Sequence, residues 1–237
     1  MHRYETPNDI PHHLQDCCES WHTGYRFVHP FRVEVFPFES DPDLIAELQR
    51  AEDAFFSSFK SRNWMFTIDM IVGWKHRFRY LNSLIEPAIP RNAEGDRAYW
   101  SLIVHIIRNS PILHGQEAHI LRALDCSRRG KAATLFGDGF DLLKKMDEPI
   151  VGWRGVRAET YTEATEAIKN GFSWTTTKDN ALWFAKQSLQ INGQLFVART
   201  TLNISDVEAY IPGQRKGGLI VRPSVIGAFD WEVLDSK

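Results

Sequence analysis

The sequence has few cysteines, no large excess of positive or negative charge, and no long apolar run. Only three cysteines occur among 237 residues, and two of them, Cys17 and Cys18, are adjacent. This sparse, odd set excludes the disulfide framework of a small secreted domain. Lys and Arg number 28 against 30 for Asp and Glu, which leaves a net charge of −2. A balance of this kind gives no overall attraction to nucleic acid or to an anionic membrane.

The sequence also lacks a segment that could cross or enter a membrane. Its most apolar run, from Trp64 to Trp74, contains Asp69 and is too short to span a bilayer. The N-terminal residues M-H-R-Y-E-T-P-N-D-I lack the apolar centre of a signal peptide. We therefore expect a protein of the reducing cytoplasm without a membrane partner.

What the sequence does contain is the composition of an ordinary soluble globular protein. Hydrophobic residues make up 43% and charged residues 24% of the chain. The length suffices for one large domain or two small ones. Changes in pattern along the chain predict an N-terminal arm at 1–38, a helical lobe at 39–148 and a β-rich core at 149–237.

The N-terminal arm offers a weak strand and a weak metal motif. From His29 the run H-P-F-R-V-E-V-F-P-F alternates apolar and polar residues, but Pro30 and Pro37 would confine such a strand to a sheet edge. Imidazole and thiolate groups are the ligands that zinc prefers. Their spacing here matches no known zinc motif, and we assign no metal site to His12, His13, Cys17, Cys18 and His22.

The lobe at 39–148 has helical periodicity. Ser40 and Pro42 suit a helix start, and apolar residues then recur every three or four positions as far as Phe59. Further helices are predicted at 64–85, 96–109, 111–124 and 139–146. Aromatic and histidine side chains in them could line a ligand pocket, but we favour core packing for Trp64, Trp74, His76, Trp100, His105 and His119. The basic group Arg128, Arg129 and Lys131 is expected on a solvated surface.

After Pro149 the chain changes to short strands separated by turns. Strands are predicted at 150–156, 172–177, 194–202, 206–211, 218–223 and 225–234, with helices at 161–170 and 178–189. Because the strands do not alternate regularly with helices, the pattern favours a mostly antiparallel sheet over a βαβ series. The expected fold class is α+β, a helical lobe followed by this sheet.

Three motifs in this core carry a resemblance to a known family. They are W-R-G at 153–155, G-F-S-W-T-T-T at 171–177 and A-L-W-F-A at 181–185. In this order, with Ser173 nineteen positions after Arg154, they resemble the arginine–serine–glutamate class of ADP-ribosyltransferases. The resemblance covers roughly the last 90 residues. It implies a split, mostly antiparallel sheet around an NAD cleft, commonly preceded by a helical lobe.

The resemblance implies a role for each matching residue. Arg154 would pair with the NAD diphosphate, and Gly155 would let the backbone approach the nicotinamide. Ser173 and Thr175 would form the serine–x–serine/threonine element that supports the site and orients the catalytic acid. Phe184 stands where the family often has an aromatic near the nicotinamide. The alternatives are a surface strand position for Arg154, ordinary strand hydroxyls for Ser173 and Thr175, and a core position for Phe184 beside its helical neighbours.

The sequence departs from the family at the catalytic glutamate. Aligning L-I-V-R-P of the stretch Q-R-K-G-G-L-I-V-R-P with the family pattern puts Gly218 at the glutamate position and Lys216 two residues before it. Three interpretations stay open: an NAD-binding relative without transfer, an inactivated form of a transferase, or an enzyme that uses another acid. Glu208 is the nearest such acid in the sequence, followed by Asp206 and Glu232.

The function implied by the resemblance is that of a mono-ADP-ribosyltransferase, a glycosyltransferase found among toxins and effectors. Such an enzyme takes NAD as substrate, breaks the nicotinamide–ribose bond and passes ADP-ribose to a protein, nucleic acid or small molecule. The turn with Gln214 and Lys216 would help to choose this acceptor. The competing hypothesis is a non-enzymatic protein that uses the same fold to bind NAD or a partner.

Overall fold

The structure, a computed structural model, describes residues 18–21, 24–27, 30–31, 42–73, 76–110, 116–137, 139–146, 149–186, 193–212 and 218–232. These residues form two compact units. The first contains 1–90 and 109–112, and the second contains 91–108 and 113–237. Among the described residues, the helices between 93 and 144 belong to the same unit as the sheet, and the division at 148/149 stays a prediction.

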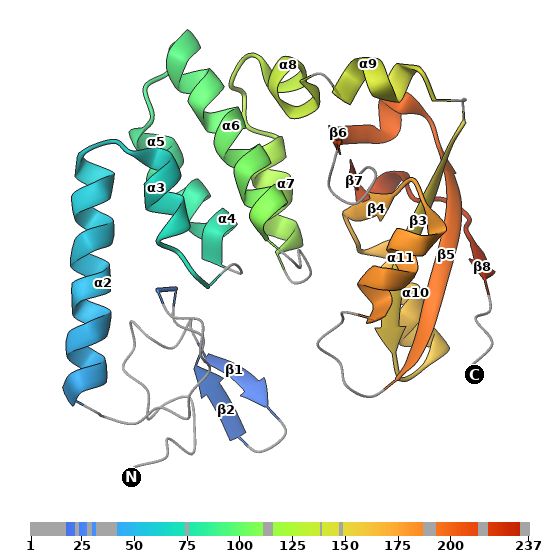
Figure 1. Cartoon of the computed structure of the whole chain (residues 1–237), viewed down its shortest axis with the longest axis horizontal. Coiled ribbons are helices and arrows are strands. Elements are labelled where there is room, and N and C mark those ends of the chain that lie inside the picture. The colour runs from blue at the N-terminus through green and yellow to red at the C-terminus, as the bar shows by residue number, and fades with distance from the viewer. Residues whose placement is uncertain are drawn as a thin grey trace. The chain divides into compact units, whose positions relative to one another are not determined.

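The first unit holds a two-stranded hairpin and a set of helices (Figure 1). The antiparallel strands β1 and β2 pair Cys18 with Phe27 and Trp21 with Gly24. Sequence analysis did not predict this hairpin, and most of the strand predicted at 29–38 lies outside the described residues. The elements are β1 (Cys18–Trp21), β2 (Gly24–Phe27), α2 (Pro42–Lys60), α3 (Trp64–Asp69), α4 (Arg77–Tyr80), the π-helix η3 (Leu81–Ile85) and α5 (Glu86–Ala88).

The helix predicted at 64–85 is wrong as a single element. It stops at Asp69, and the backbone N–H of Gly73 donates to the carbonyl of Pro30 at 2.9 Å instead of continuing a helix. The buried guanidinium of Arg77 holds this break by donating to the carbonyls of Ile71 and Asn109 at 2.9 and 3.0 Å. Burial lowers the pKa of Arg77, and the charge of Asp69 opposes this effect. The buried arginine thus satisfies one carbonyl that the broken helix leaves free and another at the C-terminal end of the helix Ala93–Asn109.

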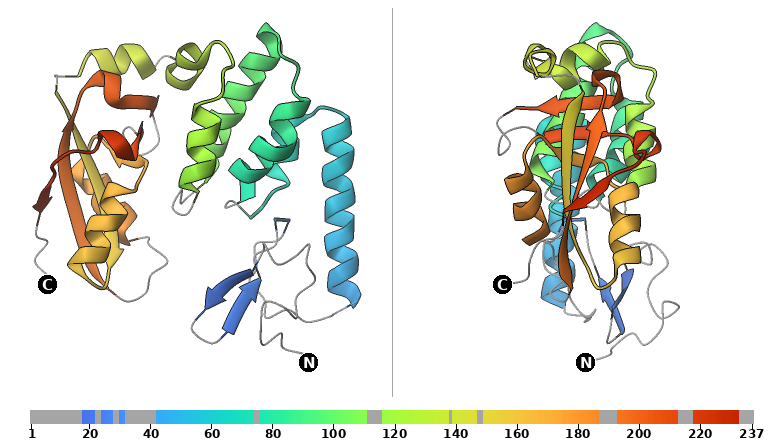
Figure 2. Two further views of the ribbon diagram at one scale, coloured as in Figure 1. Left: turned by 180° about the vertical axis from the view of Figure 1, so that it is seen from behind. Right: turned by 90° about the vertical axis from the view of Figure 1, so that its right-hand side faces the viewer.

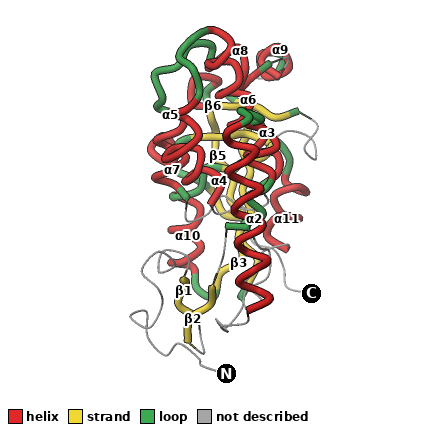
Figure 3. Tube along the Cα trace, turned by 90° about the vertical axis from the view of Figure 1, so that its left-hand side faces the viewer, coloured by secondary structure: helices red, strands yellow, loops and turns green. Residues whose placement is uncertain are grey.

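The second unit begins with four helices and continues into a six-stranded sheet. Its helices are α6 (Ala93–Asn109), α7 (Glu117–Leu124), α8 (Lys131–Phe136), α9 (Gly139–Lys144), α10 (Tyr161–Lys169) and α11 (Lys178–Lys186). Its strands are β3 (Ile150–Ala158), β4 (Ser173–Thr175), β5 (Gln194–Leu202), β6 (Val207–Ile211), β7 (Gly218–Val221) and β8 (Asp230–Glu232), with short 3₁₀ turns η4 (Ile204–Asp206) and η5 (Pro223–Val225). Helices and strands are distinguished in Figure 3.

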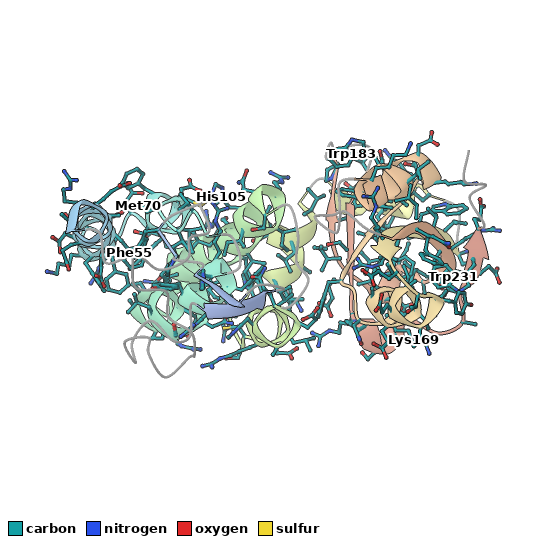
Figure 4. All side chains as sticks on the ribbon, turned by 90° about the horizontal axis from the view of Figure 1, so that it is seen from below. Phe55, Met70, His105, Lys169, Trp183 and Trp231 are labelled. Carbon is teal, nitrogen blue, oxygen red and sulfur yellow. The ribbon has the colours of Figure 1, made fainter. Side chains whose placement is uncertain are left out.

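The sheet has the strand order β6-β7-β4-β3-β5-β8, and every pair in it is antiparallel. This confirms the expected α+β class with helices first and an antiparallel open sheet second. Helices α10 and α11 cover opposite faces of the sheet (Figure 2). Seen from below, Lys169 of α10 and Trp183 of α11 lie on opposite sides of it (Figure 4). Trp174, Leu219 and Val221 belong to the core on one face.

The basic group that we expected on a solvated surface is partly buried. Arg128 is only 5% exposed, and its guanidinium pairs with Asp96 at 3.1 Å. The expectation is therefore wrong for Arg128, because a buried guanidinium requires a partner and Asp96 supplies it. Trp100 is fully buried and its indole N–H donates to the carbonyl of Arg129 at 2.8 Å, which confirms core packing for this residue.

No helix among the described residues is long and apolar enough to cross a membrane. Within the same residues, no group of His, Cys, Asp and Glu side chains could hold a metal ion.

Candidate functional site

The candidate site lies where three neighbouring strands carry the motif residues. Trp153 of β3 pairs with Thr175 of β4, and Thr175 pairs in turn with Gly218 of β7. The positions that the resemblance singles out therefore lie side by side across the sheet, although they are up to 64 residues apart in the chain (218 − 154). Sequence spacing alone could not establish this adjacency.

The contact between β3 and β4 is short. Their ladder consists of the single pair Trp153 and Thr175, whereas β3 pairs with β5 from Ile150 to Ala158. Where β3 and β4 diverge, the guanidinium Nη1 of Arg154 donates a hydrogen bond to the backbone carbonyl of Ser173. The side chain of Arg154 thus connects two strands that the backbone joins at only one position.

Arg154 is a largely shielded cation. The residue keeps intermediate exposure, but its Nε atom is out of contact with solvent and has no hydrogen-bond partner among the described residues. Burial lowers the pKa of Arg154 to about 10, and the negative charge of Glu117, the first residue of α7, opposes this shift. At neutral pH the group is still cationic. A largely shielded cation that keeps one hydrogen-bond donor without a partner is suited to binding an anionic ligand.

The backbone beside Arg154 depends on two glycines. A β-carbon on Gly171 would lie 2.0 Å from Cζ of Arg154, and one on Gly155 would lie 1.8 Å from the carbonyl oxygen of Ala181 in α11. Gly155 therefore has a packing role, since α11 occupies the space that a side chain would need. This close approach of α11 is a second explanation for the glycine, beside the nicotinamide contact that the resemblance implies.

The hydroxyl residues of β4 differ in environment. Ser173 is exposed, whereas Thr175 is 3% exposed. The Oγ1 atom of Thr175 accepts from the backbone N–H of Thr177 and from the side-chain amide of Asn180, both at the long distance of 3.5 Å. Asn180 and Thr177 were not among the predicted site residues; Thr177 ends the motif at 171–177 and Asn180 lies three residues after it, which was the available signal. Both contact Thr175, which is the strand partner of Gly218.

Phe184 does not lie in the core. Its side chain is 44% exposed on α11 and contacts Trp183 edge-to-face, with ring centroids 5.1 Å apart. The core alternative for Phe184 is therefore wrong, because Ala181 and Ala185 make up the face of α11 that packs against Gly155. Gln214 and Lys216 lie outside the described residues.

The three alternative acids all have other partners. Glu208 binds Lys131 at 2.6 Å and also Arg222. Asp206 accepts from the backbone N–H of Asn203 at 2.8 Å. Glu232 forms an ion pair with Lys178.

Neither Glu208 nor Glu232 lies beside Gly218. The strand partner of Gly218 on β6 is Ile211, which is three residues and roughly 10 Å from Glu208 along the strand. Glu232 belongs to β8. Four strand spacings, roughly 19 Å in all, separate β8 from β7 in the sheet.

No protein-family model matches this sequence, and neither a curated protein nor a solved structure matches it.

Proposed function

We propose that this protein is an ADP-ribosyltransferase-like NAD-binding protein in which Gly218 replaces the catalytic acid. The observation that supports the proposal most strongly is the pairing of Trp153 with Thr175 and of Thr175 with Gly218. It aligns the arginine motif, the serine–threonine motif and the glutamate position on consecutive strands. Two motifs recognised separately in the sequence and the glutamate position therefore lie on neighbouring strands of one sheet.

Arg154 and Ser173 would hold the ligand. The guanidinium of Arg154 has five N–H donors, of which the Nε donor is shielded and without a partner. The diphosphate of NAD supplies oxygen acceptors and negative charge, which a forked guanidinium binds well. Ser173 is exposed beside it, and its carbonyl already fixes the guanidinium. We assign NAD, rather than a metal, to this position.

The missing acid limits the chemistry. In the proposed reaction, a carboxylate stabilises the positive charge that develops on ribose as nicotinamide leaves. Removing one preorganised electrostatic group of this kind commonly lowers a rate by about 10²–10³. With glycine at 218, we expect NAD to bind and its nicotinamide–ribose bond to break slowly or not at all.

The second candidate function is pure binding of NAD or a partner without transfer. The contacts of the three alternative acids favour this candidate. Glu208 and Glu232 form ion pairs, and Asp206 accepts a hydrogen bond. Each acid would have to break such a contact before it could take part in transfer. The two candidates use the same proposed site and differ only in turnover, which is slow in the first and absent in the second. Release of nicotinamide from NAD separates them, and any acceptor of ADP-ribose would be a protein, a nucleic acid or a small molecule.

Binding of NAD by calorimetry tests the proposal. We expect the protein to bind NAD, and Arg154→Lys to weaken binding by at least about tenfold because lysine lacks the fork. Arg157→Lys is the matched control: it changes an arginine of the same strand whose side chain points to the other face. Circular dichroism verifies that both variants fold. Absence of NAD binding, or equal weakening by both variants, would contradict the proposal.

A further inference from the structure

Four charged residues of the second unit form a continuous chain of ion pairs. Nζ of Lys131 lies 2.6 Å from Oε2 of Glu208, and Nε of Arg222 binds the other oxygen, Oε1. Nη2 of Arg222 also lies 2.6 Å from Oδ1 of Asp125. We call Asp125, Arg222, Glu208 and Lys131 the ion-pair chain. Because both carboxylate oxygens of Glu208 have a cationic partner, Glu208 is its centre.

The ion-pair chain joins two parts of the unit that are distant in sequence. Asp125 directly follows α7 and Lys131 begins α8, so both belong to the connection between these helices. Glu208 lies in β6, and Arg222 directly follows β7. The chain therefore fixes the β6–β7 hairpin to the α7–α8 connection. Lys131 also lies over the ring of Trp100, 5.9 Å from its centroid, which anchors it to α6.

The β6–β7 hairpin has few other hydrogen-bonded neighbours. Within the described sheet, β6 is an edge strand beside β7 alone, and β7 continues into the sheet through the three-residue strand β4. Strand β4 in turn pairs with β3 at a single position. The buried side chains of Tyr210 and Leu219 still pack in the core. Removing the ion-pair chain should therefore loosen the hairpin without unfolding it.

We propose that the ion-pair chain is an electrostatic latch that holds the β6–β7 hairpin closed against the α7–α8 connection. Opening the latch increases the local fluctuations of the hairpin while β3 and β5 stay closed. The hairpin carries Gly218, and its connecting segment carries Gln214 and Lys216. The latch thus couples the charges of Asp125 and Lys131 to the strand that bears the candidate acid position, and this coupling does not require the protein to bind NAD.

The latch gives Glu208 a positioning role in place of a catalytic one. A carboxylate that already binds Lys131 and Arg222 would have to break both contacts before it could face a developing cation elsewhere. Lys131 would then lose its carboxylate partner and Arg222 one of its two, at a partly buried place, which is unfavourable. The same contacts therefore make Glu208 a poor substitute for the acid missing at Gly218.

Amide hydrogen exchange followed by mass spectrometry tests the latch. In Glu208→Gln, we expect peptides covering 207–221 to exchange about tenfold faster, and peptides covering 194–202 to be unchanged. The matched control is Asp230→Asn, which removes an exposed carboxylate of β8 outside the ion-pair chain. It should leave exchange in 207–221 unaltered. Equal acceleration in both regions, or no acceleration in the hairpin, would overturn the proposal.

The salt dependence of exchange and a second substitution, Lys131→Met, provide two further tests of the latch. In the unmodified protein, raising NaCl from about 20 mM to about 500 mM should speed exchange in 207–221 selectively, because salt screens partly exposed charges. Lys131→Met should speed hairpin exchange in the unmodified background but add nothing in the Glu208→Gln background. Additive effects of the two substitutions, or exchange independent of salt, would show that the four residues do not act as a latch.

Discussion

The guanidinium of Arg154 lies across Gly171, in the space that a β-carbon of residue 171 would occupy. Such an atom would come within 2.0 Å of Cζ and 2.1 Å of Nη2 of Arg154. Gly171 follows the end of α10 at Asn170 and precedes β4, while Arg154 lies in the middle of β3. The glycine therefore makes room for the arginine that connects β3 with Ser173. This relationship links a helix end, a strand and the candidate site.

Replacing Gly171 by alanine should displace the guanidinium of Arg154. We expect Gly171→Ala to lower the free energy of unfolding by about 1–3 kcal/mol through overpacking, measured by urea unfolding. The penalty should largely disappear in an Arg154→Ala background, because the group that the new methyl meets is then absent. A penalty of the same size in both backgrounds would mean that Arg154 is not the obstacle.

Replacing Gly155 by alanine should be more harmful. The new methyl would meet the backbone oxygen of Ala181 at 1.8 Å, and a backbone atom cannot move as a flexible side chain can. We expect a loss of about 3 kcal/mol or more in the free energy of unfolding. Gly227→Ala is the control, since nothing lies within 4 Å of its added methyl; it should be neutral or stabilise by up to about 1 kcal/mol. Similar effects of both substitutions would contradict the tight packing of α11 on β3.

The ion-pair chain should lose its contribution to stability in acid. The hydrogen bond from Arg222 lowers the pKa of Asp125 below its ordinary 3.8. Burial acts to raise the pKa of Glu208, but hydrogen bonds from Arg222 and Lys131 outweigh it and lower this pKa below 4.5. The folded state therefore binds these protons less readily than the unfolded chain. The stabilisation is complete above the ordinary pKa values and is lost as the pH falls through the lowered ones.

The measurement compares the unmodified protein with Asp125→Asn/Glu208→Gln at several pH values. We expect the unmodified protein to have the larger free energy of unfolding at pH 7, and the difference to shrink as the pH falls below about 4.5. A difference that is constant with pH, or that grows in acid, would show that the two carboxylates are not stabilised as charged groups.

Local patterns in the sequence were sufficient to predict much of the fold. Apolar periodicity after Ser40 predicted α2, and the run Q-L-F-V-A-R-T-T-L predicted β5 with the bounds that the structure shows. Thr160 and Glu163 form a capping box at the start of α10, which the T-x-x-E spacing could have indicated. Such signals are local because each depends on residues within one turn or one strand.

The errors arose where distant contacts decide the structure. The periodicity of 64–85 is helical throughout, yet the backbone of Gly73 binds Pro30, 43 residues earlier (73 − 30). Lys131 pairs with Glu208, 77 residues later, so one member of the basic group that was expected on the surface belongs to the ion-pair chain. Likewise, β3 and β7 flank β4 because of backbone hydrogen bonds between residues distant in the sequence, and no local pattern predicts which strands pair. The site residues could be nominated from the sequence, but their adjacency could not.

Release of nicotinamide from NAD tests the central proposal most directly. It should be measured for the unmodified protein, for Gly218→Glu and for the isosteric control Gly218→Gln. We expect background release from the unmodified protein and the Gln variant, and release at least about 100-fold faster from Gly218→Glu, because only this variant restores a carboxylate beside Thr175. Strong release by the unmodified protein, or equal release by all three, would contradict the account.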